Sequence, residues 1–385
     1  MLELIKVSAF KSLVDFELKL KKFNCIIGLN GSGKSTVLQL ISYISSIFQG
    51  NTQQWLEDRD WTNSEVVSQF KPTRKTIDIV LEFTFGDKKY LWVGTYHWEY
   101  GVCTKESLFD NTYDTKQVYR VYKNQYESIH GALININFNY KGSILSILSD
   151  EVIPYDAKRI KEYMENIESH DLLSPKVMRS GQYSRQGKLG SSGQFLIDHI
   201  HRLSDYEKDL TRESLAKYFP QVFKLETKTQ LNGTLSMSIS ERFYTENGEN
   251  VDIATDARHI NDGMLRMLNI LANQRSIARF QLFDEIENGV NPEITEKLMD
   301  SFTSSPQQTL VTTHSPMVLN YLDEELAIES IIFVYKQKNG ITRAKHLFEI
   351  PIAKAKLEEL APGEVMVDLY LEEVASAAES IKKLN

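Results

Sequence analysis

The chain has 385 residues and a formal net charge of −8, and its 42% hydrophobic and 25% charged residues are typical of a globular protein of one large domain or two. The acidic balance argues against a surface built to wrap nucleic acid, although a local basic patch is compatible with it. No apolar run has the length of a bilayer span, no signal peptide follows Met1, and Cys25 and Cys103 lack metal or disulfide spacing, so we expect a cytoplasmic protein.

The first predicted elements surround a glycine-rich loop. An apolar strand over 23–27 precedes the sequence GLNGSGKST, and a helix is predicted over 34–48. The spacing G-x-x-x-x-G-K-[ST] is typical of a loop whose backbone N–H groups surround phosphates at a helix N-terminus. Lys34 is then expected to contact the β- and γ-phosphates, and Ser35 to bind Mg²⁺. We therefore predict that ATP binds to Gly28, Leu29, Asn30, Gly31, Ser32, Gly33, Lys34, Ser35 and Thr36.

The middle of the chain is expected to hold antiparallel strands and then helices. Residues 76–86 alternate apolar and polar side chains, and a G-D-K turn leads into a second strand. Residues 143–218 have a mostly helical pattern, which the Gly/Ser-rich segment 180–193 interrupts, and residues 223–244 predict another antiparallel pair. The basic spots at 71–75 and 158–163 are interpreted as solvated faces. No repeat and no heptad array is present.

A second acidic motif follows a short apolar strand. Phe280, Leu282 and Phe283 predict a buried strand that ends at Asp284 and Glu285. At the end of such a strand, one carboxylate can support Mg²⁺ and the next can accept a proton from attacking water. We assign these roles to Asp284 and Glu285, respectively.

A third strand, over 309–313, ends at His314 and is followed at once by Ser315 and Pro316. A histidine at a strand end beside Mg²⁺-ATP can hydrogen-bond the γ-phosphate or the attacking water. The order of phosphate loop, acidic strand and histidine strand along the chain favours an ATPase, which needs a second Mg²⁺ contact and a group that positions water. Lys34, Glu285 and His314 are therefore the predicted catalytic residues.

Together these motifs resemble the ABC-type ATPase heads of the SMC/RecF/OLD superfamily, and more closely the AAA_15/AAA_21-like ATPases of bacterial defence operons (Septu, PARIS and retron-associated types). The element A-F-K-S at 9–12 is similar to that family's N-terminal motif, which places Lys11 among the nucleotide-binding residues. The loop at 28–36, L-F-D-E-I-E-N and V-T-T-H-S-P resemble its Walker A, Walker B and H-loop. The ending P-G-E-V-M-V-D at 362–368 is similar to that of the family, whereas residues 100–180 match weakly.

The resemblance implies an α/β fold: a P-loop NTPase with an ABC/SMC-type head, in which one lobe carries an antiparallel sheet and the other the signature helix. We expect the head over 1–345 and a helical tail over 346–385. Within the head, we expect an N-lobe over 1–98, a mixed β and helical insertion with partner contacts over 99–230, and a C-lobe over 231–345.

The signature helix is identified by H-I-N-D-G-M-L-R at 259–266. In this family two heads enclose two ATP molecules, and each signature caps the γ-phosphate held by the other head, which implies roles for Asn261, Asp262 and Gly263. Asn261 stands where serine is usual, and this departure bears on the hydrolysis rate. Arg266 has two equal interpretations, support of the cap or an ion pair. The family's Q-loop glutamine has no clear counterpart, and Gln69, Gln186 and Gln194 are the candidates.

The resemblance also implies partners. The residues after His314 contain no Asp-x-Asp motif of the kind that the nuclease domain of OLD-type relatives carries, and the middle region shows no SMC-like arm. We expect a homodimer or higher homo-oligomer that controls a separate nuclease or toxin in anti-phage defence. The alternatives are a RecF-like DNA-repair clamp and a non-hydrolysing scaffold that holds ATP. A membrane partner is not expected.

Overall fold

The computed structural model describes residues 1–184, 189–274 and 278–381, and it has the α/β fold that the sequence predicted. The chain forms two compact units. Unit 1 contains Met1–Ile167 and Gln308–Asn385, and unit 2 contains Glu168–Gln307. The boundaries of these units follow the compactness of the fold. The N-lobe, insertion and C-lobe expected from the sequence remain a proposal. In the described part of the chain, no helix combines the length and the apolarity needed to cross a bilayer.

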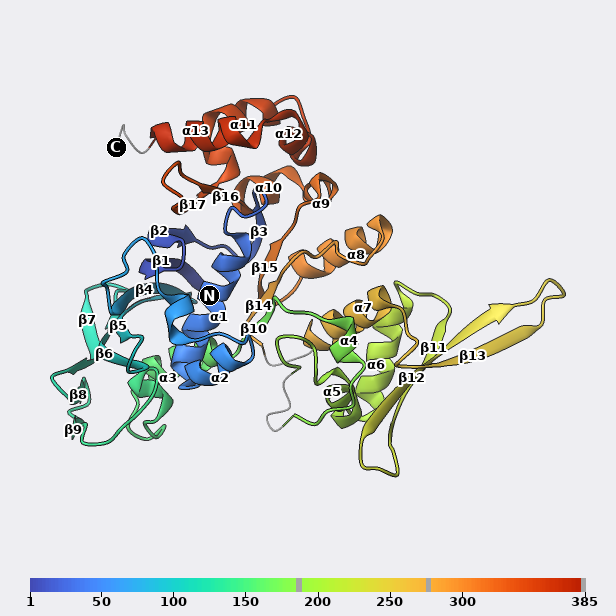
Figure 1. Cartoon of the computed structure of the whole chain (residues 1–385), viewed down its shortest axis with the longest axis horizontal. Coiled ribbons are helices and arrows are strands. Elements are labelled where there is room, and N and C mark those ends of the chain that lie inside the picture. The colour runs from blue at the N-terminus through green and yellow to red at the C-terminus, as the bar shows by residue number, and fades with distance from the viewer. Residues whose placement is uncertain (185–188, 275–277, 382–385) are drawn as a thin grey trace. The chain divides into compact units, whose positions relative to one another are not determined.

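An antiparallel sheet forms the first layer of unit 1 (Figure 1). Its alternating apolar side chains are buried on one face, as the pattern predicted. The hairpin of β4 (Thr76–Phe85) and β5 (Lys88–His97) turns at Gly86, which has a φ of 62°. In sheet order the strands are β2 (Leu13–Lys19), β1 (Leu2–Phe10), β4 (Thr76–Phe85), β5 (Lys88–His97), β6 (Val102–Asp110), β7 (Lys116–Tyr122), β8 (Gln125–Ser128) and β9 (Leu133–Asn135).

A second sheet of unit 1 carries the predicted phosphate loop. Its strands, in order, are β15 (Gln308–Thr312), β3 (Phe23–Ile27), β16 (Ile331–Lys336) and β17 (Thr342–His346). β3 pairs in parallel with both β15 and β16, and β17 is antiparallel to β16. Every residue of β3 and of β15 is buried, which explains their continuous apolar and β-branched sequences.

Helices complete unit 1. α1 (Lys34–Gln49) follows the phosphate loop and buries Val37, Leu38, Ile41 and Phe48. The C-terminal helices lie together and are drawn in red in Figure 1. The remaining helical segments are α2 (Thr52–Glu57), η1 (Asn63–Val66), η2 (Ile144–Ser146), α3 (Tyr155–Glu165), α9 (Pro316–Asn320), α10 (Glu324–Ser330), η3 (Leu347–Glu349), α11 (Pro351–Leu357), α12 (Pro362–Asp368) and α13 (Leu371–Ile381).

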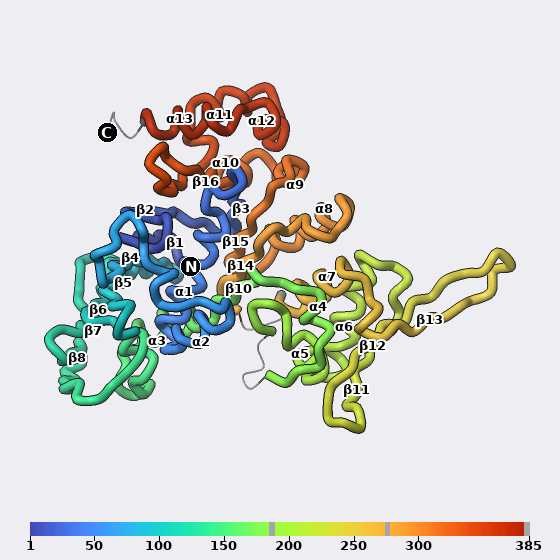
Figure 2. The backbone as a smooth tube through the Cα atoms, viewed as in Figure 1, coloured from blue at the N-terminus to red at the C-terminus, as the bar shows by residue number. Residues whose placement is uncertain are grey.

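Unit 2 combines short helices, a three-stranded antiparallel sheet and the strand of the acidic motif. The tube in Figure 2 shows that β12 and β13 form a long hairpin that extends away from the helices of the same unit. The elements are β10 (Ile167–His170), which starts at the unit boundary, α4 (Pro175–Met178), α5 (Leu196–Arg202), α6 (Asp205–Ala216), β11 (Val222–Thr229), β12 (Leu235–Tyr244), β13 (Asn250–Asp256), α7 (Asp262–Gln274), β14 (Phe280–Phe283) and α8 (Pro292–Thr303).

Candidate functional site

The loop between β3 and α1 is closed on itself by its own lysine. The Lys34 Nζ donates hydrogen bonds to the carbonyl oxygens of Gly28 at 2.9 Å and Leu29 at 3.2 Å, and the side chain is buried. The Ser32 N–H donates to the Leu29 carbonyl at 3.1 Å. The loop therefore wraps around an ammonium group that sits at the start of α1.

Two loop glycines are required by neighbouring segments. A Cβ on Gly28 would lie 2.1 Å from the Val334 carbonyl oxygen of β16, and Gly28 has a φ of 154°. A Cβ on Gly33 would lie 2.7 Å from Thr342 Oγ1 of β17, at a φ of 112°. Real Cβ atoms do not approach other atoms this closely, so only glycine fits at both positions.

Thr342 was not identified from the sequence, and it connects two of the predicted motifs. Its buried hydroxyl donates to the Ser32 carbonyl at 3.0 Å and lies 2.8 Å from Ser12 Oγ. The Thr342 N–H also donates to the Ser12 carbonyl at 2.9 Å. The A-F-K-S element is thus bonded to the phosphate loop through a strand about 300 residues away in sequence, and no local pattern marks that threonine.

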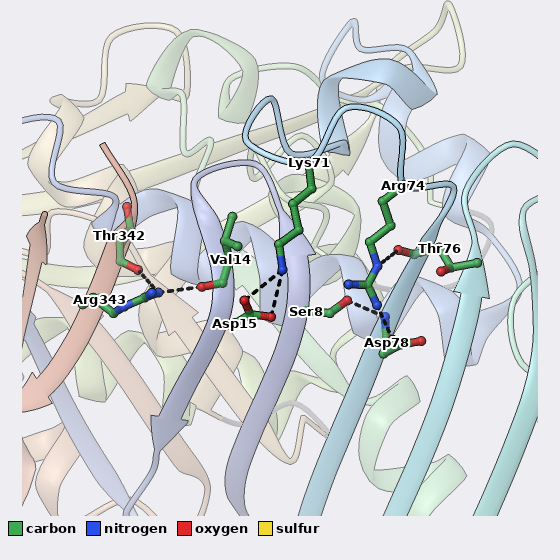
Figure 3. Close-up of polar contacts among 9 residues, drawn as sticks. All are labelled: Ser8, Val14, Asp15, Lys71, Arg74, Thr76, Asp78, Thr342 and Arg343. Carbon is green, nitrogen blue, oxygen red and sulfur yellow. Dashed lines mark hydrogen bonds and ion pairs between the residues drawn. The ribbon is translucent and has the colours of Figure 1, made fainter. Parts of the chain in front are cut away.

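Arg343, the neighbour of Thr342, fastens the same strand to β2. Figure 3 shows its guanidinium donating to the carbonyl oxygens of Val14 at 2.6 Å and Thr342 at 3.2 Å. In the same view Lys71 forms an ion pair with Asp15 at 2.8 Å. The Arg343 bond fixes β17 beside β2, next to the Thr342 bond to the phosphate loop.

Lys11 lies in the turn between β1 and β2 in a left-handed conformation, with a φ of 51°. Its Nζ donates to Gln39 Oε1 of α1 at 3.0 Å and lies 3.9 Å from the centroid of the Trp61 ring. A left-handed backbone at a non-glycine residue is strained and is enriched at functional sites. Its place beside α1 is compatible with the predicted nucleotide contact.

The start of α1 has the chemistry that an anion requires. Gly33 is the N-cap and supplies no side-chain hydrogen bond, and the first turn contains no acidic residue. The buried Ser32 Oγ has no hydrogen-bond partner in the described part of the chain. Free N–H groups, an ammonium group and an unused hydroxyl fit a phosphate group. Asn30 and Gly31 are exposed, and Ser35 and Thr36 are partly exposed in the first turn.

His314 lies at the same sheet edge as the phosphate loop. The Thr313 N–H donates to the Ile26 carbonyl of β3 at 3.1 Å, so β15 and β3 run in parallel to their last residues. The loop leaves β3 at Gly28, and His314 follows β15 as an exposed side chain. Parallel strands place their carboxyl ends together. The fold therefore brings two motifs, distant in sequence, to one edge.

The predicted acidic residues lie in unit 2, at the end of β14. Glu285 has a left-handed backbone with a φ of 50°, and its Oε2 accepts a hydrogen bond from Asn288 Nδ2 at 3.1 Å. The Asn288 N–H donates to the Glu285 carbonyl at 3.0 Å. Asn288 is a second residue that was missed from sequence, and the spacing E-x-x-N is the local signal that could have indicated it.

The predicted signature residues begin α7 in unit 2. Asn261 caps the helix, because its Oδ1 accepts a hydrogen bond from the Met264 N–H at 2.8 Å. Arg179 forms an ion pair with Asp262 at 2.6 Å and donates to the Ile260 carbonyl at 2.7 Å. A Cβ on Gly263 would lie 2.5 Å from the Gly289 carbonyl oxygen. The turn of the acidic motif and the signature helix therefore contact each other.

A buried histidine supports the acidic strand from within unit 2. His170 of β10 stacks on Phe283 with ring centroids 5.0 Å apart, and burial lowers the pKa of His170 to about 4. The ring is therefore neutral near pH 7. Its Nδ1 lies 3.5 Å from Asn273 Nδ2 of α7. The signature helix and the acidic strand share this histidine as a packing partner.

The other candidates have local roles or lie outside the described residues. Gln69 is an exposed turn residue, the Gln194 Oε1 accepts a hydrogen bond from the Ser192 N–H at 3.1 Å, and Gln186 lies outside the described residues. The basic spots are paired with acids: Lys71 with Asp15, Arg74 with Asp78, Lys75 with Glu99, and Lys158 and Lys161 with Asp150.

Comparisons with known proteins agree with this fold. The family model described as "AAA ATPase domain" (AAA_15) matches residues 1–266. An SMC head solved with the C-winged helix domain of ScpA has a TM-score of 0.52 and 16% identity, over 89% of this chain and 96% of that one. The SMC head of Pyrococcus furiosus, solved with the C-terminal domain of ScpA, has a TM-score of 0.49 and 15% identity, over 93% and 98% of the two chains. The SMC head domain of Thermotoga maritima has a TM-score of 0.42 and 13% identity, over 90% and 98%. No curated protein matches the chain.

Proposed function

The chain belongs to the AAA ATPase domain family, and from this premise we propose that it binds and hydrolyses Mg-ATP and assembles through its nucleotide. One observation carries the proposal: the phosphate loop and His314 leave neighbouring parallel strands at the same edge of one sheet. A phosphate held by the loop is then bound at the sheet edge where His314 follows β15. The uncapped start of α1 and the enclosed Lys34 ammonium support the same assignment.

The residues divide the chemistry among them. Backbone N–H groups of residues 28–36 and Lys34 bind the phosphates, and Lys11 contacts the nucleotide from the β1–β2 turn. Ser35 and Asp284 would hold Mg²⁺, and the ion would supply positive charge beside the phosphate oxygens. Glu285 accepts the proton of the attacking water, and His314 donates a hydrogen bond to the γ-phosphate. The hydrogen bond from Asn288 supports Glu285 in this role, because it orients one carboxylate oxygen.

Assembly follows from the signature. In our proposal two copies enclose two nucleotides, and Asn261, Asp262 and Gly263 of one copy cap the γ-phosphate bound by the other. The start of a helix suits an anion, because its N–H groups point outward. Asn261 performs the helix-capping task that serine also performs, so its presence preserves the shape of the α7 start. The Asn261 side chain offers an amide donor to the γ-phosphate where a serine offers a hydroxyl. We propose that this difference makes ATP hydrolysis slower than in a head whose signature carries serine.

A separate effector is the second part of the proposal. We infer that ATP-dependent assembly controls a nuclease or toxin in anti-phage defence. The β12–β13 hairpin supports the need for a partner, because it carries four exposed large apolar or aromatic residues: Phe243, Tyr244, Val251 and Ile253. Exposed apolar side chains that cluster on an extended ribbon are typical of interaction surfaces.

The two alternatives have weaker support. A RecF-like DNA clamp needs a basic surface, whereas the net charge is −8 and the lysines of the basic spots, with Arg74, form ion pairs with acidic neighbours. A non-hydrolysing scaffold needs no general base, whereas the strained left-handed backbone of Glu285 is typical of a catalytic position.

The test compares Glu285→Gln with Glu293→Gln, an exposed glutamate in the first turn of α8. We expect Glu285→Gln to slow ATP hydrolysis by about 100-fold or more while ATP binding persists, because a general base contributes about 100- to 10,000-fold. Light scattering with ATP should show a trapped dimer. Glu293→Gln should match the wild type. Hydrolysis by Glu285→Gln at the wild-type rate contradicts the assigned base.

The effector is tested by a pull-down from native cells with tagged Glu285→Gln protein, with and without ATP, read by mass spectrometry. A nuclease-like or toxin-like chain in stoichiometric amount that changes with ATP supports the defence proposal. Recovery of DNA with only self-association would favour the repair clamp.

A further inference from the structure

The C-terminal motif P-G-E at 362–364 packs against the helix that follows His314. Figure 1 shows α12, which begins with this motif, above α9, which begins two residues after His314. The two helices belong to unit 1 and contact each other directly. The proposed ATPase chemistry assigns no role to this motif.

The contact is one that only glycine allows. A Cβ on Gly363 would lie 2.1 Å from the backbone carbonyl oxygen of Pro316 and 2.6 Å from Asn320 Oδ1. The Gly363 N–H donates a hydrogen bond to the same Asn320 oxygen at 2.7 Å. The obstacle at 2.1 Å is backbone, which cannot rotate away as a flexible side chain can. α12 and α9 are therefore joined at a fixed separation.

The residues around Gly363 set its orientation. Pro362 occupies the first turn of α12, where a proline is tolerated because no intrahelical donor is lost. Glu364 accepts a hydrogen bond from the Ala361 N–H at 2.9 Å, which closes the start of the helix. Gly363 itself is buried between them. Pro362 and Glu364 thus shape the start of α12 so that Gly363 packs against Pro316.

The segment that carries His314 is consequently fixed at both ends. On one side, the Thr313 N–H donates to the Ile26 carbonyl of β3 at 3.1 Å, and the Thr313 hydroxyl accepts from the Ser315 N–H at 3.0 Å. On the other side, the Pro316 carbonyl meets Gly363. Only His314 and Ser315 lie between these anchors, so a shift of Pro316 must move the backbone of His314.

We propose that Gly363 and Asn320 are positioning residues that set the place of His314 at the phosphate edge. This inference rests on the proposed function for its catalytic consequence, and its structural part stands on the contacts alone. A Cβ at position 363 displaces Pro316, and the His314 ring then loses its alignment with the γ-phosphate. Nucleotide binding persists, because neither residue belongs to the phosphate loop.

The first experiment measures steady-state kinetics of Gly363→Ala, with Val367→Ala as the control on an exposed residue of the same helix. We expect the kcat of Gly363→Ala to fall by about 10-fold with an unchanged KM and an unchanged affinity for a non-hydrolysable ATP analogue, as for loss of an interaction made only in the transition state. Asn320→Ala should fall similarly, and Asn320→Asp, which keeps the acceptor oxygen, should recover most of the rate. Val367→Ala should equal the wild type.

The decisive comparison repeats Gly363→Ala in a His314→Ala background. If Gly363 acts through His314, the second substitution has no further effect on kcat. An equal additional loss in that background overturns the inference, and so does a wild-type kcat for Gly363→Ala. If His314→Ala itself hydrolyses at the wild-type rate, the assignment of His314 in the proposed function is wrong.

A measurement without turnover separates the two proposals further. Ring resonances of His314 in NMR spectra should shift in Gly363→Ala and Asn320→Ala and stay in place in Val367→Ala. Asn320→Ala introduces no clash and so remains informative if Gly363→Ala does not fold. Unchanged His314 resonances in both variants overturn the positioning role, whether or not the protein hydrolyses ATP.

Discussion

The two units hold their parts of the candidate site in different ways. In unit 1 the phosphate loop and His314 are held by residues far away in sequence: Val334 and Thr342 close on Gly28 and Gly33, and Gly363 closes on Pro316. In unit 2 the closest polar contacts of the acidic turn and of the signature helix start are near neighbours, Asn288 beside Glu285 and Met264 beside Asn261, and Arg179 is the distant residue that pairs with Asp262. The nucleotide-binding part is a product of tertiary structure, whereas the acidic and signature parts are largely local turns.

Each unit also buries a titratable group, Glu106 in unit 1 and His170 in unit 2, and burial shifts the pKa values of these two groups in opposite directions. In unit 1, Glu106 of β6 accepts hydrogen bonds from Ser143 Oγ and the Ile144 N–H, both at 2.6 Å, and burial raises the pKa of Glu106 to about 7. In unit 2, burial lowers the pKa of His170 to about 4. The two groups therefore give the folded chain opposite dependences on pH.

The largest expected effect on ATP binding and stability comes from replacing a glycine whose Cβ would meet backbone, compared with a glycine whose Cβ would meet no atom. Gly28→Ala places a Cβ against the backbone of β16, so we expect loss of ATP binding and a lowered melting temperature. Gly31→Ala, which has a φ of 74° and no atom within 4 Å of its Cβ, should cost about 1 kcal/mol and keep binding. Gly263→Ala should be milder than Gly28→Ala, because the exposed turn at Gly289 can move. Titration calorimetry and thermal melts measure all three, and equal losses for Gly28→Ala and Gly263→Ala would contradict the comparison.

The pH dependence is the next largest effect. The folded state of Glu106 binds a proton more tightly than the unfolded state, so its contribution to the free energy of unfolding is full below pH 4.5 and is lost as pH rises toward 7, by about 3 kcal/mol. Glu106→Gln should therefore gain stability over the wild type at pH 8 compared with pH 5. Urea denaturation at both pH values measures this difference.

His170 acts in the opposite direction. Its folded pKa is lowered, so stability is full above pH 6.5 and is lost, again by about 3 kcal/mol, as pH falls toward 4. His170→Phe keeps a ring against Phe283 and removes the titrating group, so it should flatten the acid side of the urea-stability profile. A variant that loses stability in parallel with the wild type from pH 6.5 to 4 would refute this assignment.

Thr342→Val tests the long-range link of unit 1. The variant keeps the shape of the side chain and removes the hydroxyl shared by Ser12 and Ser32, so we expect a loss of about 1–3 kcal/mol in stability. ATP affinity should fall with it. Thr104→Val, at an exposed hydroxyl on β6, is the matched control. ATP affinity and stability equal to those of the wild type would show that the loop does not need this contact.

Asn288→Ala tests the local link of unit 2. Removal of the amide that orients Glu285 should lower kcat by about 10-fold, which corresponds to about 1.4 kcal/mol. KM and the unfolding free energy should stay near the wild-type values, because Asn288 is exposed. A rate loss accompanied by a matching loss of stability would indicate a purely structural role.

The smallest effect is expected at Asn261. Asn261→Ser should leave the stability of the chain within about 0.5 kcal/mol, since both residues cap helices, and Asn261→Ala should cost about 1 kcal/mol. We also expect Asn261→Ser to raise the ATP-hydrolysis rate, which a phosphate-release assay measures. If Asn261→Ser hydrolysed ATP more slowly than the wild type, Asn261 would not be the cause of a low hydrolysis rate.

The sequence predicted the elements that depend on local spacing. The strand, loop and helix around residues 28–36 were predicted at their observed places, because glycine spacing acts within a few residues. The signature helix was expected from His259 onward, whereas the observed helix begins at Asp262, after the Asn261 cap. The roles of Lys34, Asp284, Glu285 and His314 remain predictions. The contact of Arg179 with Asp262 was not predicted, since no period connects residues so far apart.

By itself the sequence determined the family, the α/β class and the order of the nucleotide motifs, because each is encoded in a short run of residues with its own backbone preferences. The tertiary structure alone decided that Thr342 fastens the phosphate loop to Ser12 and that Gly363 meets Pro316 beside His314. The physical reason is that these contacts arise only when segments distant in sequence pack together, and steric fit at such distances leaves no periodic trace in the chain.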